Sequence, residues 1–454
     1  MATNWQPHNY QRTAIKFMVS QGAAGLFLDP GLGKTSITYG AFKVLRAKGL
    51  VRRMLVVAPL RPAVSVWPNE CRKWTDFESL RVRVLHGKER ELCPELSEVD
   101  IINPEGLGWL FKAVQGQPWP WDMLVIDEST RFKHASTLRF KTLKPWLTKF
   151  QRRYILTGTP APNGLLDLFG QVYILDLGNA LGRFITHYRN SYFDPTGFGG
   201  YTWVPRADSG TRIYAKLRPL VLRMSAEDYL ELPPLIYNTV RVDLPQRAQK
   251  MYDEMEDLLL TQLEGHTIIA ANSGAATQKC RQIANGGVYD ADGTWANIHD
   301  AKTEAVQELV EELSGKPALV AYEFKHDLER LMQAFPQARH LGGGTTTKQQ
   351  REIEMLWNAG ALPVLLVQPQ SAAHGLNLQG TNAAIIIHSL MWDLENHDQL
   401  IRRVWRQGQK ERVVVHSIVA AGTVDEVIMK GVARKDKTQK TLLDALKSHL
   451  KGKH

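Results

Sequence analysis

A glycine-rich segment that ends in lysine and threonine, LDPGLGKT at residues 28–35, has the composition of a phosphate-binding loop. It follows a short apolar run and precedes a helix-like run, SITYGAFKVL. Gly31 and Gly33 allow the backbone to curl, so that its N–H groups and the next helix N-terminus face phosphate oxygens. Lys34 can then reach the β- and γ-phosphates, and Thr35 can ligate Mg²⁺. These residues predict a site for ATP and Mg²⁺.

A second chemical motif, DMLVIDEST at residues 122–130, lies downstream in the same predicted domain. Its apolar run delivers Asp127 and Glu128 at the carboxyl end of a strand, where open parallel sheets bind their ligands. Asp127 would hold Mg²⁺, and Glu128 would orient and deprotonate the attacking water. Each motif has a structural alternative, since Leu28 replaces the usual first glycine of the loop and an Asp-Glu pair can be a solvated turn. Their order in one domain favours the nucleotide site.

Two further segments carry side chains that a nucleotide site could use. Gln11 in HNYQRTAI precedes the loop, and its amide could read the adenine edge with the Tyr10 ring nearby, although a surface helix start is the alternative. RRVWRQGQ, residues 402–409, is expected to present Arg403 and Arg406 on one helical face. An arginine supplied by another domain stabilises charge on the transferring γ-phosphoryl group, whereas a generic basic helix is the alternative. Arginines and nucleotide on different domains suggest a motor driven by domain closure.

The elements that must position these residues are two series of short apolar runs separated by helix-like stretches. The first series is Gly25–Leu28, Met54–Ala58, Arg81–Leu85, Asp122–Ile126 and Arg153–Leu156. The second series is ALVAY after Lys316, Pro363–Val367, Ala383–His388 and Arg412–Val419. Strands joined by crossover helices imply parallel sheets covered on both faces. We therefore expect two α/β domains.

The alternation breaks between residues 162 and 300. Residues 194–210 contain Gly, Pro and aromatic residues and are expected to form a loop, whereas residues 246–263 have helical periodicity. We interpret the whole segment as an irregular, partly helical insertion that joins the two domains.

Composition limits the classes of protein. The 56 Lys+Arg against 46 Asp+Glu give a net charge of +10, which excludes an acidic disordered chain and permits a polyanionic partner. Residues 430–454 carry eight Lys/Arg against two Asp. This segment is expected to be either an amphipathic helix with a solvated basic face or a DNA contact. Cys71, Cys93 and Cys280 are too few for a disulfide framework or a zinc cluster. No apolar run approaches the roughly 18 residues needed to span a bilayer, so no membrane association is expected. The few cysteines indicate a reducing compartment, and a cytoplasmic location is expected.

The motifs, in this order, resemble the helicase superfamily 2 core and specifically its Swi/Snf-like branch of DNA-dependent ATPases. The resemblance covers most of the chain and includes HNYQ, PGLGKT, LVVAPL, the trio Trp67, Glu70 and Trp74, LHGK, INPEGL, DEST, LTGTPAPN, LRMSAEDYLELPP, KCRQIANG, HGLNLQG, QLIRRVWRQGQ and GTVDE. DEST replaces the commoner Asp-Glu-Ala-His, and Arg402 stands where the family usually has Asp. The compact form is similar to Swi/Snf-like proteins of phages and bacteria.

The resemblance implies two RecA-like parallel-sheet domains in tandem with a partly helical insertion between them. The expected boundaries are an ATP-binding domain at 1–225, a connecting or protrusion region at 226–300 and a helicase domain with a basic C-terminal helix at 301–454. It also implies DNA contacts by loops of both domains. The candidates are Pro59, Arg61, Asn103 and Ser371, with Asn377 nearer the domain cleft, and each could instead be an ordinary loop residue.

The resulting hypothesis is an ATP-driven translocase on double-stranded DNA, acting in phage or bacterial DNA replication, recombination or repair. A strand-separating or annealing helicase and the motor subunit of a restriction or defence complex with a partner nuclease are the alternatives. A passive DNA-binding scaffold with a relict nucleotide fold is a further one, against which the set Lys34, Thr35, Asp127, Glu128, Arg403 and Arg406 argues. For a phage-encoded protein the location would be the host cytoplasm.

Overall fold

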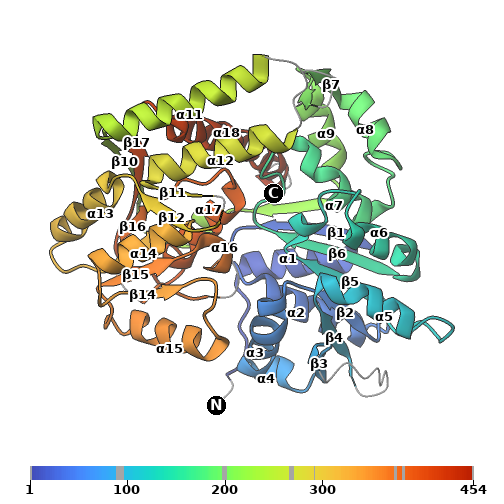
Figure 1. The fold of residues 1–454 in the computed structure, drawn as a ribbon. Helices are drawn as coiled ribbons and strands as arrows, with labels where there is room; N and C mark the ends of the chain where they lie inside the picture. Colours follow the sequence, from blue (N-terminus) through green and yellow to red (C-terminus); the bar gives the residue numbers. More distant parts are fainter. Residues whose placement is uncertain are drawn as a thin grey trace. The chain divides into compact units, whose positions relative to one another are not determined.

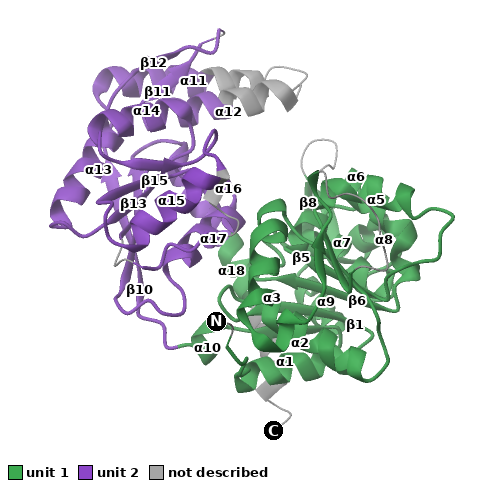
Figure 2. Cartoon of the chain, turned by 90° about the horizontal axis from the view of Figure 1, so that it is seen from below, with its two compact units in different colours: residues 1–230, 435–454 green, residues 231–434 purple. Residues whose placement is uncertain are grey.

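The computed structural model describes residues 3–87, 97–196, 202–264, 270–290, 292–372, 376–380 and 384–451. The chain divides into two compact units, one of residues 1–230 with 435–454 and one of residues 231–434 (Figure 2). The three-part division at residues 225 and 300 stays a prediction. Lys88 of LHGK, Cys93, and His374 and Gly375 of HGLNLQG lie outside the described residues.

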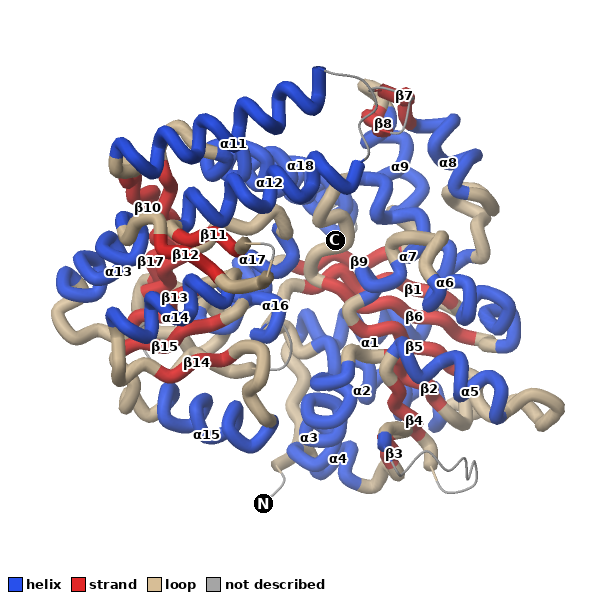
Figure 3. The backbone as a smooth tube through the Cα atoms, viewed as in Figure 1, coloured by secondary structure: helices blue, strands red, loops and turns tan. Residues whose placement is uncertain are grey.

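A parallel sheet forms the centre of the first unit (Figure 3). Within the described ranges it has seven strands in the order β3-β4-β2-β5-β6-β1-β9. Their bounds are β1 Ala23–Leu28, β2 Met54–Val57, β3 Val82–Val84, β4 Val99–Ile102, β5 Met123–Asp127, β6 Arg152–Thr157 and β9 Val221–Met224. Val56 is paired with Ile101 on one side and Val125 on the other. The central strands are apolar at nearly every position because both faces of the sheet are covered.

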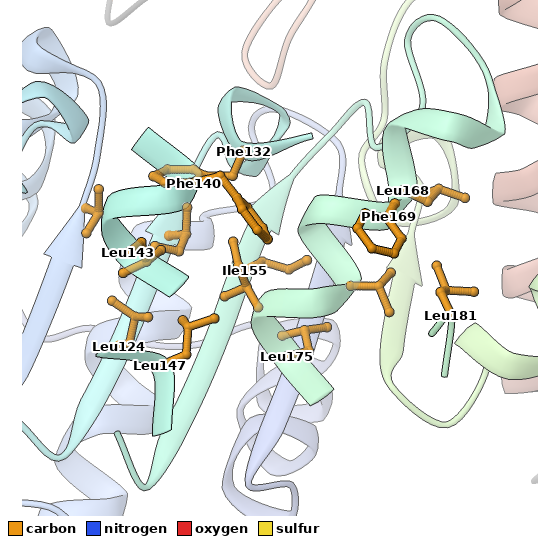
Figure 4. Close-up of a cluster of buried hydrophobic side chains, with 14 of the residues drawn as sticks. Leu124, Phe132, Phe140, Leu143, Leu147, Ile155, Leu168, Phe169, Leu175 and Leu181 are labelled. Atoms are coloured by element: carbon orange, nitrogen blue, oxygen red, sulfur yellow. The ribbon is translucent and has the colours of Figure 1, made fainter. Parts of the chain in front are cut away.

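Helices cover this sheet on both faces (Figure 1). Their bounds are α1 Asn9–Ser20, α2 Lys34–Ala47, α3 Trp67–Lys73, α4 Thr75–Glu78, α5 Leu107–Ala113, α6 Leu138–Leu143, α7 Leu168–Asp176, α8 Ile185–Tyr192, α9 Ser209–Leu217 and α10 Ala226–Tyr229. Helix α1 packs on β1 and α2. On the other face, Leu124 and Ile155 of the sheet belong to one buried cluster with Phe140 of α6 and Phe169 of α7 (Figure 4). This packing fixes the strand ends from which the candidate site residues project.

The second unit is built on another parallel sheet. Its described strands have the order β10-β17-β16-β13-β15-β14. Their bounds are β10 Leu235–Val242, β13 Ala318–Ala321, β14 Arg339–Leu341, β15 Val364–Val367, β16 Ala384–Ile387 and β17 Val413–Ala420. Two parallel sheets in a mixed α/β fold match the expected tandem RecA-like class.

The helices of the second unit also cover both faces of its sheet. Their bounds are α11 Gln246–Glu264, α12 Ala270–Asn285, α13 Ala301–Glu312, α14 Lys325–Ala334, α15 Thr347–Asn358, α16 Pro369–Ala372, α17 Leu394–Val404 and α18 Val424–Lys451, of which α18 continues into the first unit from Lys435. Trp357 of α15 and Leu400 of α17 pack in one buried cluster with Ile385, whereas Val306 of α13 and Leu331 of α14 pack in another with Ile386. In the part of the chain that is described, no helix is long and apolar enough to cross a membrane.

The interpretation of residues 162–300 as an insertion is wrong for two strands. Strand β9 pairs in parallel with β1 and completes the first sheet, and β10 pairs in parallel with β17 and completes the second. Both are edge strands, whose place is set by a partner about 180 or more residues away and not by their own pattern. Helix α11 confirms the helical periodicity predicted for residues 246–263.

The expected loop at residues 194–210 is also wrong in part. Strand β7 (Phe193–Thr196) pairs antiparallel with β8 (Thr202–Pro205), and Ser209 begins α9. The exposed Arg206 side chain donates to Asp194 Oδ1 at 2.8 Å and holds the base of this hairpin. A second antiparallel pair, β11 (Gly287–Tyr289) with β12 (Trp295–Asn297), lies in the other unit.

Candidate nucleotide-binding and catalytic site

The predicted phosphate loop connects β1 to α2, as the motif requires. Gly31 and Gly33 have φ of 91° and 78°, in the left-handed region that favours glycine. A Cβ on Gly33 would also lie 2.6 Å from Gln11 Nε2, so a larger residue there would displace the Gln11 amide. Lys34 begins the helix, and its Nζ donates to the Leu28 carbonyl at 2.9 Å. The departure at Leu28 is therefore a side-chain change in β1 that leaves the backbone acceptor for Lys34 in place.

Gln11 contacts the phosphate loop directly. It lies at the start of α1 and is buried, with its Nε2 donating to the Leu32 carbonyl at 3.3 Å and its Oε1 accepting from His8 N–H at 3.0 Å. Tyr10 stacks on His8 with ring centroids 5.4 Å apart and lies 5.0 Å from the Tyr229 ring. Gln11 is therefore both a helix-start residue and a neighbour of the loop, beside a group of three rings.

A buried ion pair anchors the loop to the edge strand β9. Arg223 Nη1 donates to Asp29 Oδ1 at 2.6 Å, and both side chains are at least 93% buried. The same nitrogen donates to the Phe27 and Met224 carbonyls, while Asp29 Oδ2 accepts from Ala226 N–H at 3.0 Å. Because each charge has several partners, the pair can remain ionised away from water. Sequence reasoning missed both residues, although Arg223 belongs to the LRMSAEDYLELPP segment that it singled out.

Asp127 and Glu128 stand at the carboxyl end of β5, as predicted. Asp127 Oδ2 accepts from the Trp67 indole N–H at 2.9 Å, and its Oδ1 accepts from Glu128 N–H at 3.1 Å. Burial, followed by the charge of Glu128, raises the pKa of Asp127 to about 6, although the Trp67 hydrogen bond and Lys34 act in the opposite direction. Lys34, Asp127 and Glu128 are therefore brought to one edge of one sheet.

The donor set fits a magnesium ion. Mg²⁺ is usually bound by one or two protein oxygens together with waters and phosphate oxygens. The Thr35 hydroxyl in the first turn of α2 and the Asp127 carboxylate supply such oxygens, and the two adjacent acidic groups place negative charge that a divalent cation would offset. Nowhere in the described ranges do three or more His, Cys, Asp or Glu side chains gather to hold a metal alone.

The trio Trp67, Glu70 and Trp74 supports the nucleotide site from α3 and its end. Trp67 holds Asp127, as stated above. Glu70 Oε1 accepts from the Trp74 indole at 2.7 Å and from Ser36 Oγ in the first turn of α2 at 2.5 Å. The Tyr39 hydroxyl of α2 donates to the Trp67 carbonyl at 3.0 Å. Through these contacts the trio noted in the sequence connects α3 to both α2 and β5.

The predicted DNA-contacting residues of the first unit follow strand ends. Pro59 and Arg61 come after β2, and Asn103 comes directly after β4, at the same carboxyl edge as Asp127. Asn103 Nδ2 donates to Glu105 Oε2 at 2.8 Å, whereas its buried Oδ1 has no hydrogen-bond partner among the residues that the structure describes. Their contact with DNA stays a prediction.

In the second unit, Ser371 and Asn377 follow β15 at its carboxyl end. Ser371 lies on α16 with its Oγ 3.2 Å from Gln368 Oε1, and the Asn377 N–H donates to Glu354 Oε1 at 2.9 Å. Glu354 is a residue of α15 that sequence reasoning did not identify.

Arg403 and Arg406 do not share one helical face, which corrects the expectation from their spacing. Helix α17 ends at Val404, because Trp405 leaves the helical conformation and its indole donates to the Pro233 carbonyl at 2.7 Å. Arg406 therefore lies beyond the helix. Burial raises the pKa of Glu354, and the charges of Arg403 and Arg406 act in the opposite direction. Burial also lowers the pKa of Arg406. Both arginines therefore act electrostatically on one carboxylate, although they do not share a helical face.

Sequence reasoning also did not identify Gln171 of α7. Its fully buried amide lies between the loops after β5 and β6, and it accepts from Ser129 Oγ at 2.7 Å. A polar residue inside the apolar run of α7, LFGQVYILD, is the only local signal that could have pointed to it.

Comparison with known proteins gives matches over most of the chain. The SNF2-related domain matches residues 10–288, and the Helicase conserved C-terminal domain matches residues 301–408. The chain is 35% identical to protein p41 of Acyrthosiphon pisum secondary endosymbiont phage 1 over 460 residues, which are 97% of this chain and 98% of that protein.

Eukaryotic relatives are more distant and longer. The chain is 26% identical to the DNA repair and recombination protein RAD54 of Oryza sativa subsp. japonica, over 96% of this chain and 51% of that protein. It is 23% identical to the human DNA annealing helicase and endonuclease ZRANB3, over 98% of this chain and 41% of that protein. The chain thus spans about half or less of these two proteins. Among solved structures, the Sulfolobus solfataricus SWI2/SNF2 ATPase core in complex with dsDNA matches with a TM-score of 0.47 and 22% identity, covering 100% of this chain and 96% of that one.

Proposed function

Because this chain belongs to the SNF2-related family and is a DNA-dependent ATPase of that kind, we propose that it couples ATP hydrolysis to translocation along double-stranded DNA. The observation that carries the proposal is the meeting of Lys34, Asp127 and Glu128 at the carboxyl edge of one parallel sheet. This edge is where open α/β sheets bind and process their ligands.

We assign the chemistry of this edge as follows. The backbone of residues 31–35 and Lys34 bind the phosphates of ATP, and Gln11 reads the adenine edge. Thr35 and Asp127 would hold Mg²⁺, which when bound neutralises charge that develops on the phosphate oxygens. Glu128 orients the attacking water and accepts its proton. Trp67 keeps the Asp127 carboxylate in place through the indole hydrogen bond.

DNA contact is assigned to the loops after β2, β4 and β15. Pro59, Arg61, Asn103 and Ser371 lie in loops at the carboxyl ends of these strands, where loop polar groups and backbone N–H groups can meet a phosphate backbone. The net charge of +10 favours a polyanion as partner. The names of the relatives, a DNA repair protein and a DNA annealing helicase, support DNA as this partner.

The test is the ATPase rate of the full chain without nucleic acid, with single-stranded DNA, with duplex DNA and with RNA. We expect duplex DNA to stimulate turnover most. Displacement of the third strand of a triplex, without separation of a forked duplex, would support translocation. Equal stimulation by all nucleic acids, or none by duplex DNA, would contradict the proposal.

The second candidate is a strand-separating or annealing motor, which the DNA annealing helicase among the relatives favours. It predicts strong unwinding of a forked duplex and preferential stimulation by single strands. A restriction or defence motor would additionally require a nuclease partner, which co-purification with the native host extract would reveal.

We place the biological role in phage or bacterial DNA replication, recombination or repair, in the cytoplasm of the cell. The 35% identity to a phage protein over nearly the whole of both chains supports the first part. Cys71 and Cys280 are buried free thiols, as is usual in a reducing compartment.

A further inference from the structure

Glu128 has an unusual backbone conformation. Its φ of 49° and ψ of 61° lie in the left-handed region, which is unfavourable for a residue with a Cβ. Such a conformation persists only where the surrounding structure holds the chain on both sides. On its amino-terminal side, Asp127 ends β5 and accepts from the Glu128 N–H. The restraint on the carboxyl side must come from the turn that follows.

That turn, Ser129–Phe132, is fixed through one buried side chain. Ser129 is fully buried, and its Oγ donates to Gln171 Oε1 at 2.7 Å. Gln171 is fully buried as well. Water competes little for a hydrogen bond between a buried hydroxyl and a buried amide. This bond therefore fixes Ser129 relative to Gln171.

The other end of the Gln171 amide holds the loop after the neighbouring strand. Its Nε2 donates to the Pro160 carbonyl at 2.6 Å and to the Asp167 carbonyl at 2.8 Å. Pro160 lies in the part of LTGTPAPN that follows β6, and β6 lies next to β5 in the sheet. One side chain therefore joins the loops at the carboxyl ends of two adjacent strands.

Helix α7, which carries Gln171, is itself immobilised. Phe169 and Leu175 of α7 lie beside Ile155 of β6 in the buried cluster of the first unit (Figure 4). Gly170 packs so closely on the turn that a Cβ there would lie 2.1 Å from the Phe132 carbonyl oxygen. The helix thus presents Gln171 from a fixed position.

From this arrangement we infer that Gln171 is a positioning residue for the ATPase reaction: through Ser129 it holds the backbone of Glu128 in the conformation from which that carboxylate acts. The inference rests on the catalytic role proposed above for Glu128. Gln171 contacts Ser129 and Pro160 and is not itself assigned to contact nucleotide.

The experiment compares Q171M, S129A and the double variant in the full chain, with kcat and KM for ATP measured at saturating duplex DNA. Misplacement of a catalytic group by about 1 Å can lower a rate by up to about 100-fold. We expect Q171M to lower kcat by about 10- to 100-fold, S129A to lower it less, and KM to change by less than about twofold in both. The double variant should be no slower than Q171M, because the two substitutions remove one shared bond.

Y188F is the matched control. Tyr188 is a fully buried residue of the same cluster, and its hydroxyl donates to the Leu165 carbonyl at 2.8 Å, which is none of the bonds that Gln171 makes with Ser129, Pro160 and Asp167. It should lower the Tm as much as S129A does and leave kcat within about twofold, since it removes one buried bond of the same kind.

The outcomes separate the inference from its premise. If E128Q hydrolyses ATP normally, the assignment of Glu128 fails and the inference fails with it. If E128Q is inactive while Q171M and S129A keep wild-type kcat and only lose Tm, Gln171 is a core residue alone and the inference is overturned. A loss of kcat in Q171M and S129A, with KM preserved and Y188F active, supports it.

Discussion

Lys34 shows how a single residue is prepared for its ligand by the backbone around it. Its Nζ donates to the Leu28 carbonyl, so the ammonium group is held where β1 ends and the loop with its positive-φ glycines begins. A phosphate would replace this carbonyl as the partner or share the ammonium group with it. The lysine thus needs no large movement to bind ATP, which lowers the entropy that is lost on binding.

We predict that K34A abolishes ATP turnover and leaves DNA affinity within about twofold, because the candidate DNA contacts lie in other loops. Turnover, binding of a fluorescent nucleotide analogue and duplex DNA binding are the three measurements. K48A is the matched control, since Lys48 is an exposed lysine at the other end of α2. Equal loss of nucleotide and DNA binding in K34A would mean a misfolded protein or a wrongly assigned site.

Loss of the Arg223 side chain should destabilise the first unit strongly. Methionine at this position would leave the Asp29 carboxylate buried without its cation. We expect R223M to lower the free energy of unfolding by about 3–5 kcal/mol, as for other broken buried pairs. Urea unfolding of the full chain measures it.

K250A is the control for R223M, because Lys250 pairs with Glu254 at 3.9 Å on an exposed helix surface. Exposed pairs of this kind contribute about 0.5 kcal/mol or less. A change below about 1 kcal/mol in R223M would show that the buried pair does not anchor the loop.

At the scale of elements, a buried polar network joins α12, α13 and α14 to the ends of β16 and β17. Asp327 of α14 accepts from Ser389 Oγ at 2.7 Å and from Asn285 Nδ2 of α12 at 3.2 Å. Lys302 of α13 donates to Asn285 Oδ1 at 2.7 Å and forms a buried ion pair with Asp425 at 2.5 Å. These bonds help to fix the packing of α12, α13, α14 and α18, the last of which carries Asp425, at the ends of two strands of one sheet.

Two buried histidines of this network make the second unit sensitive to acid. Burial lowers the pKa of His388 to about 3 and that of His299 to about 4. The groups that face them are Asp327, Asp300, His326, Arg330 and Lys302. Because both histidines have a pKa of about 6.5 in the unfolded chain, the unfolded state binds more protons than the folded state below that pH.

We therefore predict that stability is complete above pH 6.5 and is lost as the pH falls toward 4. The free energy of unfolding should decrease by about 1.4 kcal/mol per pH unit for each histidine in this window. Urea unfolding at pH 7.5, 6 and 5 checks the slope. H388Q should flatten it by the share of one histidine, and an unchanged slope in that variant would exclude His388 as a source.

At the scale of the whole molecule, Arg403 and Arg406 test whether the two units act as one motor. If both stabilise charge on the γ-phosphoryl group in the transition state, R403A and R406A should lower DNA-stimulated kcat by about 10³-fold or more and change ATP affinity little. Lysine at either position should rescue poorly, since an ammonium lacks the planar fork of a guanidinium. R351A is the control. The charge of Arg351, like those of Arg403 and Arg406, opposes the rise in the pKa of Glu354, but Arg351 lies outside RRVWRQGQ.

The alternative for these arginines is binding of DNA phosphates. In that case each alanine variant would weaken DNA affinity and reduce the salt slope by about one, with kcat at saturating DNA unchanged. Measurement of kcat and of the salt slope on the same variants distinguishes the two roles.

Local pattern was sufficient for much of this molecule. Apolar runs predicted nine strands of the two sheets. The motifs LDPGLGKT and DEST placed Lys34 at a helix start and Asp127 and Glu128 at a strand end. These features depend on residues within a few positions of one another, since strand burial and a glycine turn are properties of short segments.

Packing set the rest, because it joins residues that are far apart in the chain. Strands β9 and β10 are edge strands recognised only by their partners β1 and β17. Arg223 meets Asp29 across 194 residues, and Gln171 meets Ser129 across 42. Arg406 lies beyond the end of α17 because the Trp405 indole donates to the Pro233 carbonyl, and helical periodicity does not predict this contact. Such contacts depend on how the helices and strands pack in the folded core. The spacing of residues within one short segment does not determine that packing.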